Sequence, residues 1–179
     1  MEERIEISLR EEKNEEKASL RLSPAVLRKL PKLLGGERRQ QPVRLTFAMR
    51  GSDVIDVQDG DTTGRCFGAA FDIGTTTVVG MLWDLCDGSL KSDCAETNPQ
   101  GIYGADVISR ITYAGKSDEN LREISDRIIE CCNAMIDKLT SECGIGKDDV
   151  YETAFAGNTT MSHLLLGTDP GDLALAPFN

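Results

Sequence analysis

Histidine is almost absent from this chain, in which His163 is the only one. A catalytic triad pairs a nucleophile with a histidine base, and zinc sites draw several His or Cys ligands from short spacings. A lone histidine in an early helical turn is more often a packing or capping residue than a base. The sequence therefore does not support triad hydrolysis or a zinc centre.

Long apolar runs and an excess of basic residues are missing as well. No segment approaches the length of a transmembrane helix, and the charged N-terminus lacks the apolar core of a signal peptide. The formal charge is −10 at pH 7, which argues against nucleic acid or an anionic membrane as the main partner. We therefore expect a cytoplasmic protein that binds neither nucleic acid nor membrane.

Cysteine is present, but not at metal-binding spacings. The six positions are Cys66, Cys86, Cys94, Cys131, Cys132 and Cys143. They contain no Cys-x-x-Cys pair and no iron–sulfur spacing, and the adjacent pair would point in different directions on a helix. We expect free thiols, in keeping with a reducing compartment, and no iron–sulfur cluster in this chain.

The distribution of charge indicates two modules. Residues 1–65 have a net charge of +1, whereas residues 66–179 have a net charge of −11. The first module is predicted to be a small α+β unit with strands near residues 4–9, 42–49 and 54–58. Ser23 and Pro24 predict a helix start and Gly35 its end, but Pro31 makes one long regular helix doubtful, so that two short turns are an alternative.

The second module is predicted to follow the order β-β-β-α-β-α. Strands are expected at 68–73, at the apolar run ending at Asp84, and at 89–97. Helical segments follow at 107–114 and about 120–143, then a strand at 149–156 and a helix at 161–167. Three sequential strands, a helical layer and a returning strand indicate an α/β architecture.

The segment Phe71–Asp84 contains the clearest functional signal. An apolar run with one carboxylate, Asp72, breaks at Gly74 and resumes after Thr75, Thr76 and Thr77. This pattern predicts a β-hairpin whose tip binds an oxyanion, because glycine lets the backbone approach a ligand and the following amides can point together. The hydroxyls add donors, and Asp72 could hold a hydrated Mg²⁺ beside phosphates.

The alternative is an ordinary hairpin whose threonines serve β-propensity. Against it, a carboxylate has no structural reason to occupy a buried strand two residues before the glycine.

Two further segments have residue types suited to a ligand site. In Gly157–His163 a strand passes directly into a helix, whose free amides could bind an anion, or Asn158 and Thr159 could simply cap it. The amides of Asn98–Gln100 could orient a ligand or only close a turn, and Asp106 is expected to cap the next helix. The two Gly/Thr-rich breaks at strand ends could face one cleft.

Four blocks together resemble a known family. They are Asp72–Val79, Asn98–Gln100, Tyr103–Ile111 and Gly157–His163. The first resembles the phosphate-binding hairpin of actin-like ATPases, a superfamily that includes sugar kinases and heat-shock ATPases. In combination they resemble the ATP-dependent reductive activators of corrinoid proteins, which are ferredoxin-like proteins with an actin-like C-terminal domain. The resemblance is close over residues 66–179 and loose over residues 1–65.

This resemblance implies a fold and an activity. Residues 1–65 would form a small middle or linker module, and residues 66–179 the first half of an actin-like, ribonuclease H-like ATPase domain. ATP hydrolysis would drive an electron onto cob(II)alamin and restore cob(I)alamin on the corrinoid protein of a methyltransferase system, which would be the partner. Whether the chain forms a homodimer stays open.

The implied cofactors are ATP and Mg²⁺, and no catalytic residue is identified. The residues that would hold the nucleotide are Asp72, Gly74, Thr75, Thr76, Thr77, Asn98, Gln100, Gly157, Asn158, Thr159 and Thr160, with Asp72 as the metal ligand.

Two departures from the family qualify this prediction. Many members begin with a [2Fe–2S] domain, which no cysteine pattern here could supply. The chain ends at Asn179, where the second half of the ATPase domain is expected to begin, so we interpret it as a truncated piece that binds ATP weakly or not at all alone. A small-molecule kinase of the same superfamily and a non-catalytic interaction module remain alternatives.

Overall fold

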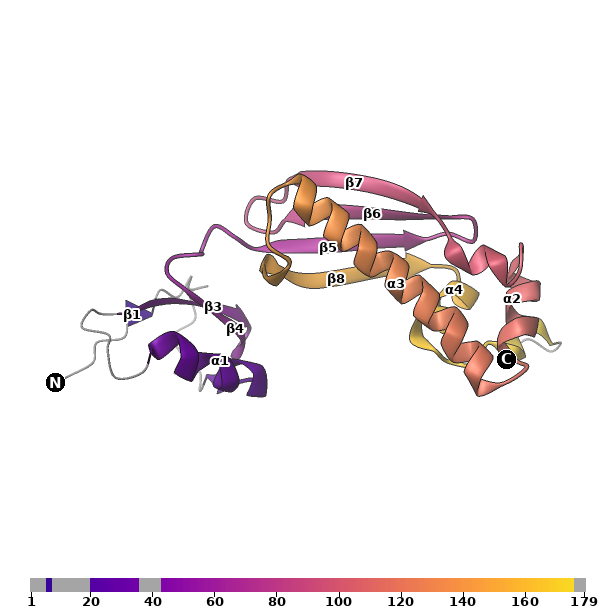
Figure 1. The fold of residues 1–179 in the computed structure, drawn as a ribbon, viewed down its shortest axis with the longest axis horizontal. Helices are drawn as coiled ribbons and strands as arrows, with labels where there is room; N and C mark the ends of the chain where they lie inside the picture. Colours follow the sequence, from indigo (N-terminus) through magenta and orange to yellow (C-terminus); the bar gives the residue numbers. More distant parts are fainter. Residues whose placement is uncertain (1–5, 8–19, 36–42, 176–179) are drawn as a thin grey trace. The chain divides into compact units, whose positions relative to one another are not determined.

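The computed structural model describes residues 6–7, 20–35 and 43–175. The chain divides into two compact units, Met1–Gly64 (unit 1) and Arg65–Asn179 (unit 2), whose elements are labelled in Figure 1. The charge shift in the sequence lies at nearly the same place, between residues 65 and 66. Most of the strand predicted at residues 4–9 lies outside the described residues.

Unit 1 is a mixed four-stranded sheet with one helix. The sheet order is β1-β3-β4-β2, formed by β1 (Glu6–Ile7), β3 (Arg44–Arg50), β4 (Asp53–Asp59) and β2 (Arg21–Leu22). The pair β3–β4 is antiparallel, and the two short outer strands are parallel to their neighbours. Helix α1 (Pro24–Leu34) packs on β4, and the core consists of Val26, Leu45, Val54 and Val57.

Helix α1 corrects one prediction. The Ser23 hydroxyl accepts from the Val26 amide, and Gly35 ends the helix at φ 72°, as expected. However, the helix continues through Pro31 as one 11-residue segment. Proline at this position leaves the Leu27 carbonyl without its helical donor, and Leu27 is 56% exposed. Water can bind a carbonyl on that exposed side, so the helix does not have to break there.

Unit 2 contains a four-stranded sheet of order β7-β6-β5-β8. Its strands are β5 (Phe67–Ile73), β6 (Thr77–Asp84), β7 (Leu90–Thr97) and β8 (Val150–Gly157). The first three form an antiparallel meander, and β8 returns parallel to β5. Because β5 and β8 are parallel neighbours, their carboxyl ends lie at the same edge of the sheet.

The helices of unit 2 lie between β7 and β8 in the sequence and after β8. They are the short turn η1 (Pro99–Ile102), α2 (Val107–Ala114), α3 (Asp118–Glu142), η2 (Lys147–Asp149), α4 (Thr159–Leu166) and η3 (Gly171–Ala174). The predicted β-β-β-α-β-α order is confirmed, with α2 and α3 both in its first helical layer. The predicted caps Asp106 and Asn158 accept from backbone amides at the starts of α2 and α4.

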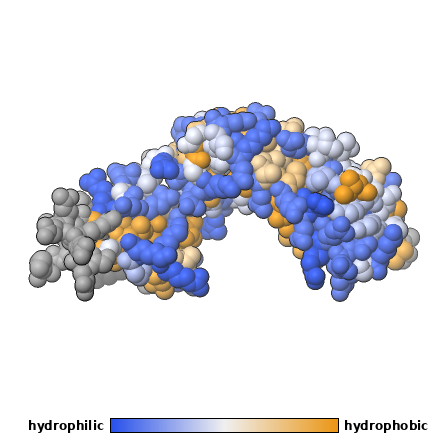
Figure 2. Space-filling view, in the orientation of Figure 1, coloured by the Kyte–Doolittle hydropathy of each residue, from blue (hydrophilic) through white to orange (hydrophobic). Residues whose placement is uncertain are grey.

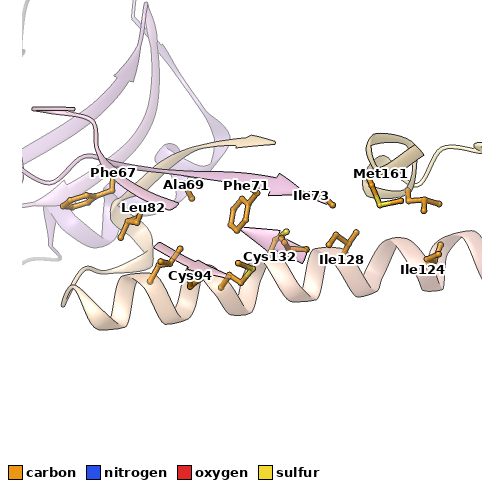
Figure 3. Close-up of a cluster of buried hydrophobic side chains, with 14 of the residues drawn as sticks. Phe67, Ala69, Phe71, Ile73, Leu82, Cys94, Ile124, Ile128, Cys132 and Met161 are labelled. Carbon is orange, nitrogen blue, oxygen red and sulfur yellow. The ribbon is translucent and has the colours of Figure 1, made fainter. Parts of the chain in front are cut away.

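The core of unit 2 lies between the sheet and α3. Alternate residues of β5 point to this side, namely Phe67, Ala69, Phe71 and Ile73, as Figure 3 shows. Ile124, Ile128, Cys132, Met135 and Leu139 of α3 pack against them. On the face seen in Figure 2, hydrophilic residues surround the few hydrophobic patches of unit 2. Within the described ranges, no helix has the length and apolar character needed to cross a membrane.

Candidate functional site

The turn between β5 and β6 is closed by Gly74. Its amide donates to the Thr77 carbonyl at 3.0 Å. A Cβ atom built on Gly74 would lie 2.6 Å from that carbonyl oxygen, closer than any real Cβ contact. Glycine is therefore required for close approach of the two backbone segments, and not for a positive φ.

The next three carbonyls of the turn are all bonded to donors from other elements. The Asn98 side chain donates through Nδ2 to the Gly74 carbonyl at 2.8 Å, and its backbone amide donates to the Thr76 carbonyl at 2.8 Å. Between them, Arg110 donates through Nη2 to the Thr75 carbonyl at 2.6 Å. Asn98 and Arg110 are 2% and 1% exposed, so these donors lie on the buried side of the turn.

This arrangement directs two amides outward. In a planar trans peptide the N–H points opposite to the C=O, so the Thr75 and Thr76 amides point away from the buried donors. Among the described residues neither amide has a hydrogen-bond acceptor. Thr75 is half-buried and Thr76 and Thr77 are exposed. Adjacent outward amides with hydroxyls beside them are donors of the kind that bind an anion.

The second Gly/Thr-rich turn lies next to the first. The parallel register pairs Gly157 at the end of β8 with Ile73 of β5. Asn158 accepts the Met161 amide through Oδ1 at 2.9 Å and donates through Nδ2 to the Thr75 hydroxyl at 3.3 Å. The structure thus brings the two turns together, with Thr159 exposed and Thr160 buried at the start of α4.

Asp72 lies beside the turn, but it is not buried. Its side chain points to the opposite face of the sheet from Phe71 and Ile73 and is exposed, so the premise that a buried strand held an unexplained carboxylate was wrong. Among the described residues, no three His, Cys, Asp or Glu side chains could hold a metal together. Asp72 as a ligand of Mg²⁺ therefore stays a prediction.

The structure places Asn98 and Gln100 behind the turn. Asn98 caps η1 by accepting the Gln100 amide at 2.9 Å, and Gln100 donates through Nε2 to the Ile124 carbonyl at 3.0 Å. Gln100 is 0% exposed, and its Oε1 has no partner in the described part of the chain. Asn98 bonds the turn directly, whereas Gln100 joins η1 to α3, and direct contact of either residue with a ligand stays a prediction.

Sequence reasoning missed Arg110. This residue occupies the apolar stripe of α2 that otherwise consists of Val107, Ile111 and Ala114, at helical spacing. A charged residue at a core position is the signal that could have revealed it, because buried charges are rare unless they have a role.

The cysteines are all free thiols in this structure, two of them buried and four half-buried. Burial raises the pKa of the Cys132 thiol to about 12, so this side chain stays neutral at physiological pH and belongs to the core. His163 bonds through Nδ1 to the Thr159 carbonyl at 2.8 Å. Because a carbonyl only accepts, Nδ1 holds a proton; the bond lies within α4, whose N-cap is Asn158.

Comparison with known proteins identifies the family. A family model described as the RACo middle region matches residues 67–179. The chain belongs to this family. The matched range covers the hairpin turn, the Asn98–Gln100 segment, α2 and the start of α4.

This RACo-family chain is also similar to one protein by sequence and to one solved structure. It is 40% identical over 136 residues to the "Corrinoid activation enzyme RamQ" of Eubacterium limosum. The aligned residues cover 75% of this chain and 23% of that protein. A solved structure of a "Reductive activator for corrinoid,iron-sulfur protein" superposes with a TM-score of 0.71 at 33% identity, over 89% of this chain and 26% of the other. The predicted α/β, actin-like fold class is thereby confirmed. This chain spans about a quarter of the length of each of these two relatives.

Proposed function

We propose that this chain is part of an ATP-dependent reductive activator that restores cob(I)alamin on a corrinoid protein of a methyltransferase system. The outward amides of Thr75 and Thr76 beside the N-terminus of α4 support this proposal. Two proteins to which the chain is similar are described as a corrinoid activation enzyme and as a reductive activator for a corrinoid, iron-sulfur protein. A nucleotide-dependent activator would require a phosphate-binding site, and these outward donors would supply one.

The residues present suit a nucleotide phosphate with its metal. The Thr75 and Thr76 amides and the threonine hydroxyls would donate to phosphate oxygens, and the exposed Thr159 would add a hydroxyl at the start of α4. Exposed Asp72 would contact Mg²⁺ through its water shell, which suits a cation that keeps several waters. When bound, ATP would supply the free energy for a reduction that ordinary cellular donors cannot drive.

The reaction itself moves one electron. Cob(II)alamin gains an electron and becomes cob(I)alamin, and a low-potential one-electron donor is oxidised in exchange. The donor would be a redox centre in a separate protein or domain, since among the described residues no three His, Cys, Asp or Glu side chains could hold a metal together. We infer that the chain contributes the nucleotide-dependent step, in the cytoplasm, where the donor and the corrinoid protein are both accessible.

Calorimetric titration with Mg-ATP tests the first half of the proposal. It should be done on this chain and on any longer product of the same reading frame, because this chain spans only about a quarter of the length of the two relatives. Thr75→Val removes the hydroxyl that accepts from Asn158, and Thr75→Ser keeps it. We expect the valine variant to weaken Mg-ATP binding by about 5-fold, corresponding to about 1 kcal/mol for one hydrogen bond, and the serine variant to bind as wild type.

ATP hydrolysis with and without a corrinoid protein tests the second half. Faster hydrolysis in the presence of the corrinoid protein, with cob(I)alamin appearing in the absorbance spectrum when a reductant is supplied, supports the activator. Phosphate transfer to a small molecule instead would identify a kinase. Binding of the corrinoid protein with no effect of nucleotide would identify an interaction module, and absence of any ATP binding by the longer product would overturn the proposal.

A further inference from the structure

Arg110 is the largest fully buried side chain of the described residues, with 1% exposure. A buried guanidinium is costly unless its charge is compensated, usually by a carboxylate. No carboxylate in the described part of the chain forms an ion pair with it. Burial lowers its pKa, and the more distant Asp106 partly opposes that effect, but an arginine stays charged at physiological pH. The protein therefore maintains an uncompensated positive charge behind the turn.

The donors of Arg110 join three elements. Nε donates to the Gly104 carbonyl at 2.9 Å, Nη2 to the Thr75 carbonyl at 2.6 Å, and Nη1 to the Met161 sulfur at 3.4 Å. The first contact is within the segment before α2, the second is with the β5–β6 turn, and the third is with α4. A thioether is only a weak acceptor, so α4 receives little of the charge. The strongest contact is with the turn.

Glycine at position 104 is needed for the contact between its carbonyl and Arg110. A Cβ on Gly104 would lie 2.5 Å from the Ser109 Cβ and 2.9 Å from the Arg110 amide nitrogen. Any larger residue would push the segment away from α2 and displace the carbonyl that accepts from Nε. Glycine at this position keeps the guanidinium in place, with one side anchored to its own segment and the other directed at Thr75.

The bond to Thr75 acts on the amide of the next residue. The Thr75 carbonyl and the Thr76 N–H belong to the same peptide unit and point in opposite directions. Holding the carbonyl inward fixes the N–H outward, and a cationic donor on the oxygen polarises the whole peptide, which strengthens the N–H as a donor. The charge of the guanidinium also attracts an anion placed on the other side of this single peptide.

We propose that Arg110 is a positioning residue of the anion site: it fixes the Thr75–Thr76 peptide with its N–H outward and supplies the positive charge that an oxyanion of the phosphate class neutralises on binding. This inference rests on the proposed function for the identity of the ligand as a nucleotide. It does not require that the ligand be ATP, because inorganic pyrophosphate presents the same oxygens to the turn.

Two variants of Arg110 and one control test it. Arg110→Met removes the charge and all donors at similar length, and Arg110→Lys keeps the charge but cannot bond Gly104 and Thr75 together. Leu139→Ala is the stability control, because Leu139 is 0% exposed and lies about 22 Å further along α3 than Ile124, which contacts Gln100 behind the turn. Its cavity lowers stability without touching the turn.

Two titrations of each protein are required. Mg-ATP binding is measured by calorimetry, and inorganic pyrophosphate binding by the shifts of the Thr75 and Thr76 amide resonances. We expect Arg110→Met to weaken both by about 10-fold to 100-fold, the range for a charged hydrogen bond. The affinities of Arg110→Lys for both ligands should lie between those of Arg110→Met and wild type. Leu139→Ala should bind both ligands as wild type does, even if it melts at the same temperature as Arg110→Met.

The outcomes separate this inference from the proposed function. If wild type binds Mg-ATP and Arg110→Met binds it equally well, or no worse than Leu139→Ala, the role of Arg110 is overturned and the nucleotide function stands. If the longer product of the same reading frame binds pyrophosphate through Arg110 but not Mg-ATP, the nucleotide function is overturned and the role of Arg110 stands. If the longer product binds neither Mg-ATP nor pyrophosphate, both are wrong.

Discussion

Gly74 shows how a single residue sets the geometry of the site. Because a Cβ there would lie 2.6 Å from the Thr77 carbonyl oxygen, Gly74→Ala must open the turn. We expect it to lower the free energy of unfolding by about 1–3 kcal/mol, as overpacking does, and to abolish measurable pyrophosphate binding. Chemical denaturation and the amide titration measure the two effects.

Gly64→Ala is the matched control for this prediction. A Cβ at Gly64 meets no atom within 4 Å and its φ is not positive, so the change should stay within about 0.5 kcal/mol of wild type. An unchanged denaturation midpoint in Gly74→Ala would contradict the close approach of the two backbone segments in the turn.

At the residue scale, the role of a side chain was predictable from the sequence when its partner lies close to it along the chain. The caps Ser23, Asp106 and Asn158 were predictable because a cap and its amide lie within three residues of each other. The roles of Asn98 and Arg110 depend on their approach to Thr75 and Gly74, and no local pattern encodes a contact between residues 35 positions apart. The sequence therefore indicated the turn residues as a candidate site, but it did not indicate that Arg110 holds the turn from the buried side.

At the scale of elements, α2 and α3 are joined by a titratable contact. Tyr113 of α2 donates to Glu123 of α3 at 2.6 Å, and Tyr103 donates to the other oxygen of the same carboxylate at 3.0 Å. The bond to Glu123 raises the pKa of Tyr113 to about 12. The same two hydroxyls lower the pKa of Glu123, with Tyr113 the larger cause.

The pH dependence of this contact follows from the two shifts. Glu123 has a lowered pKa, so its contribution to stability is complete above its ordinary pKa of 4.5 and is lost as the pH falls below it. Tyr113 has a raised pKa, so its contribution is complete below its ordinary value of 10.0 and is lost as the pH rises towards about 12. The contact should stabilise the helix pair most between these limits.

Comparison of wild type with Tyr113→Phe across the pH range tests this window. The difference between their free energies of unfolding should be constant between about pH 5 and pH 10 and shrink on both sides. As a control, Glu123→Gln should shift the absorbance titration of Tyr113 back towards its ordinary range. A difference that does not vary with pH would show that the hydroxyl does not bond to the carboxylate in solution.

The extent of the elements was largely predictable, and the exceptions have a physical cause. Helix α3 begins at Asp118, two residues before the predicted start, because the Ser117 hydroxyl accepts the Asn120 amide. Helix α1 crosses Pro31 because packing on β4 compensates for one lost hydrogen bond. Local rules indicate where a helix can end, and tertiary contacts decide whether it does.

At the scale of the whole molecule, the two edges of the sheet in unit 2 differ in their protection. Strand β7 has three charged side chains, Lys91, Asp93 and Glu96, whereas β8 has only Glu152. Charged residues discourage pairing with another strand. In β8, Phe155 stacks on Phe71 and is 45% exposed. We therefore expect this chain to self-associate through β8 as its concentration rises.

Phe155→Lys should weaken this association by about 10-fold or more, because burial of one phenylalanine contributes about 1.5–3 kcal/mol. Leu90→Lys on β7 is the matched control, since Leu90 is also 45% exposed, and it should leave the association unchanged. Sedimentation velocity over a range of concentrations measures both. Equal weakening by the two variants would mean that the edge of β8 is not the contact.

The buried bonds behind the hairpin turn also determine how this site can diverge among related sequences. Thr76 and Thr77 are exposed and Thr75 is half-buried, so exchanges among small polar residues there would adjust which anion the proposed site binds and how tightly. Asn98 and Arg110 hold the peptides from within, so their exchange would remove the anion preference itself. A relative that retains all three threonines but lacks Asn98 or Arg110 could therefore have lost the site. A relative that replaces one threonine but retains both buried residues could have kept it.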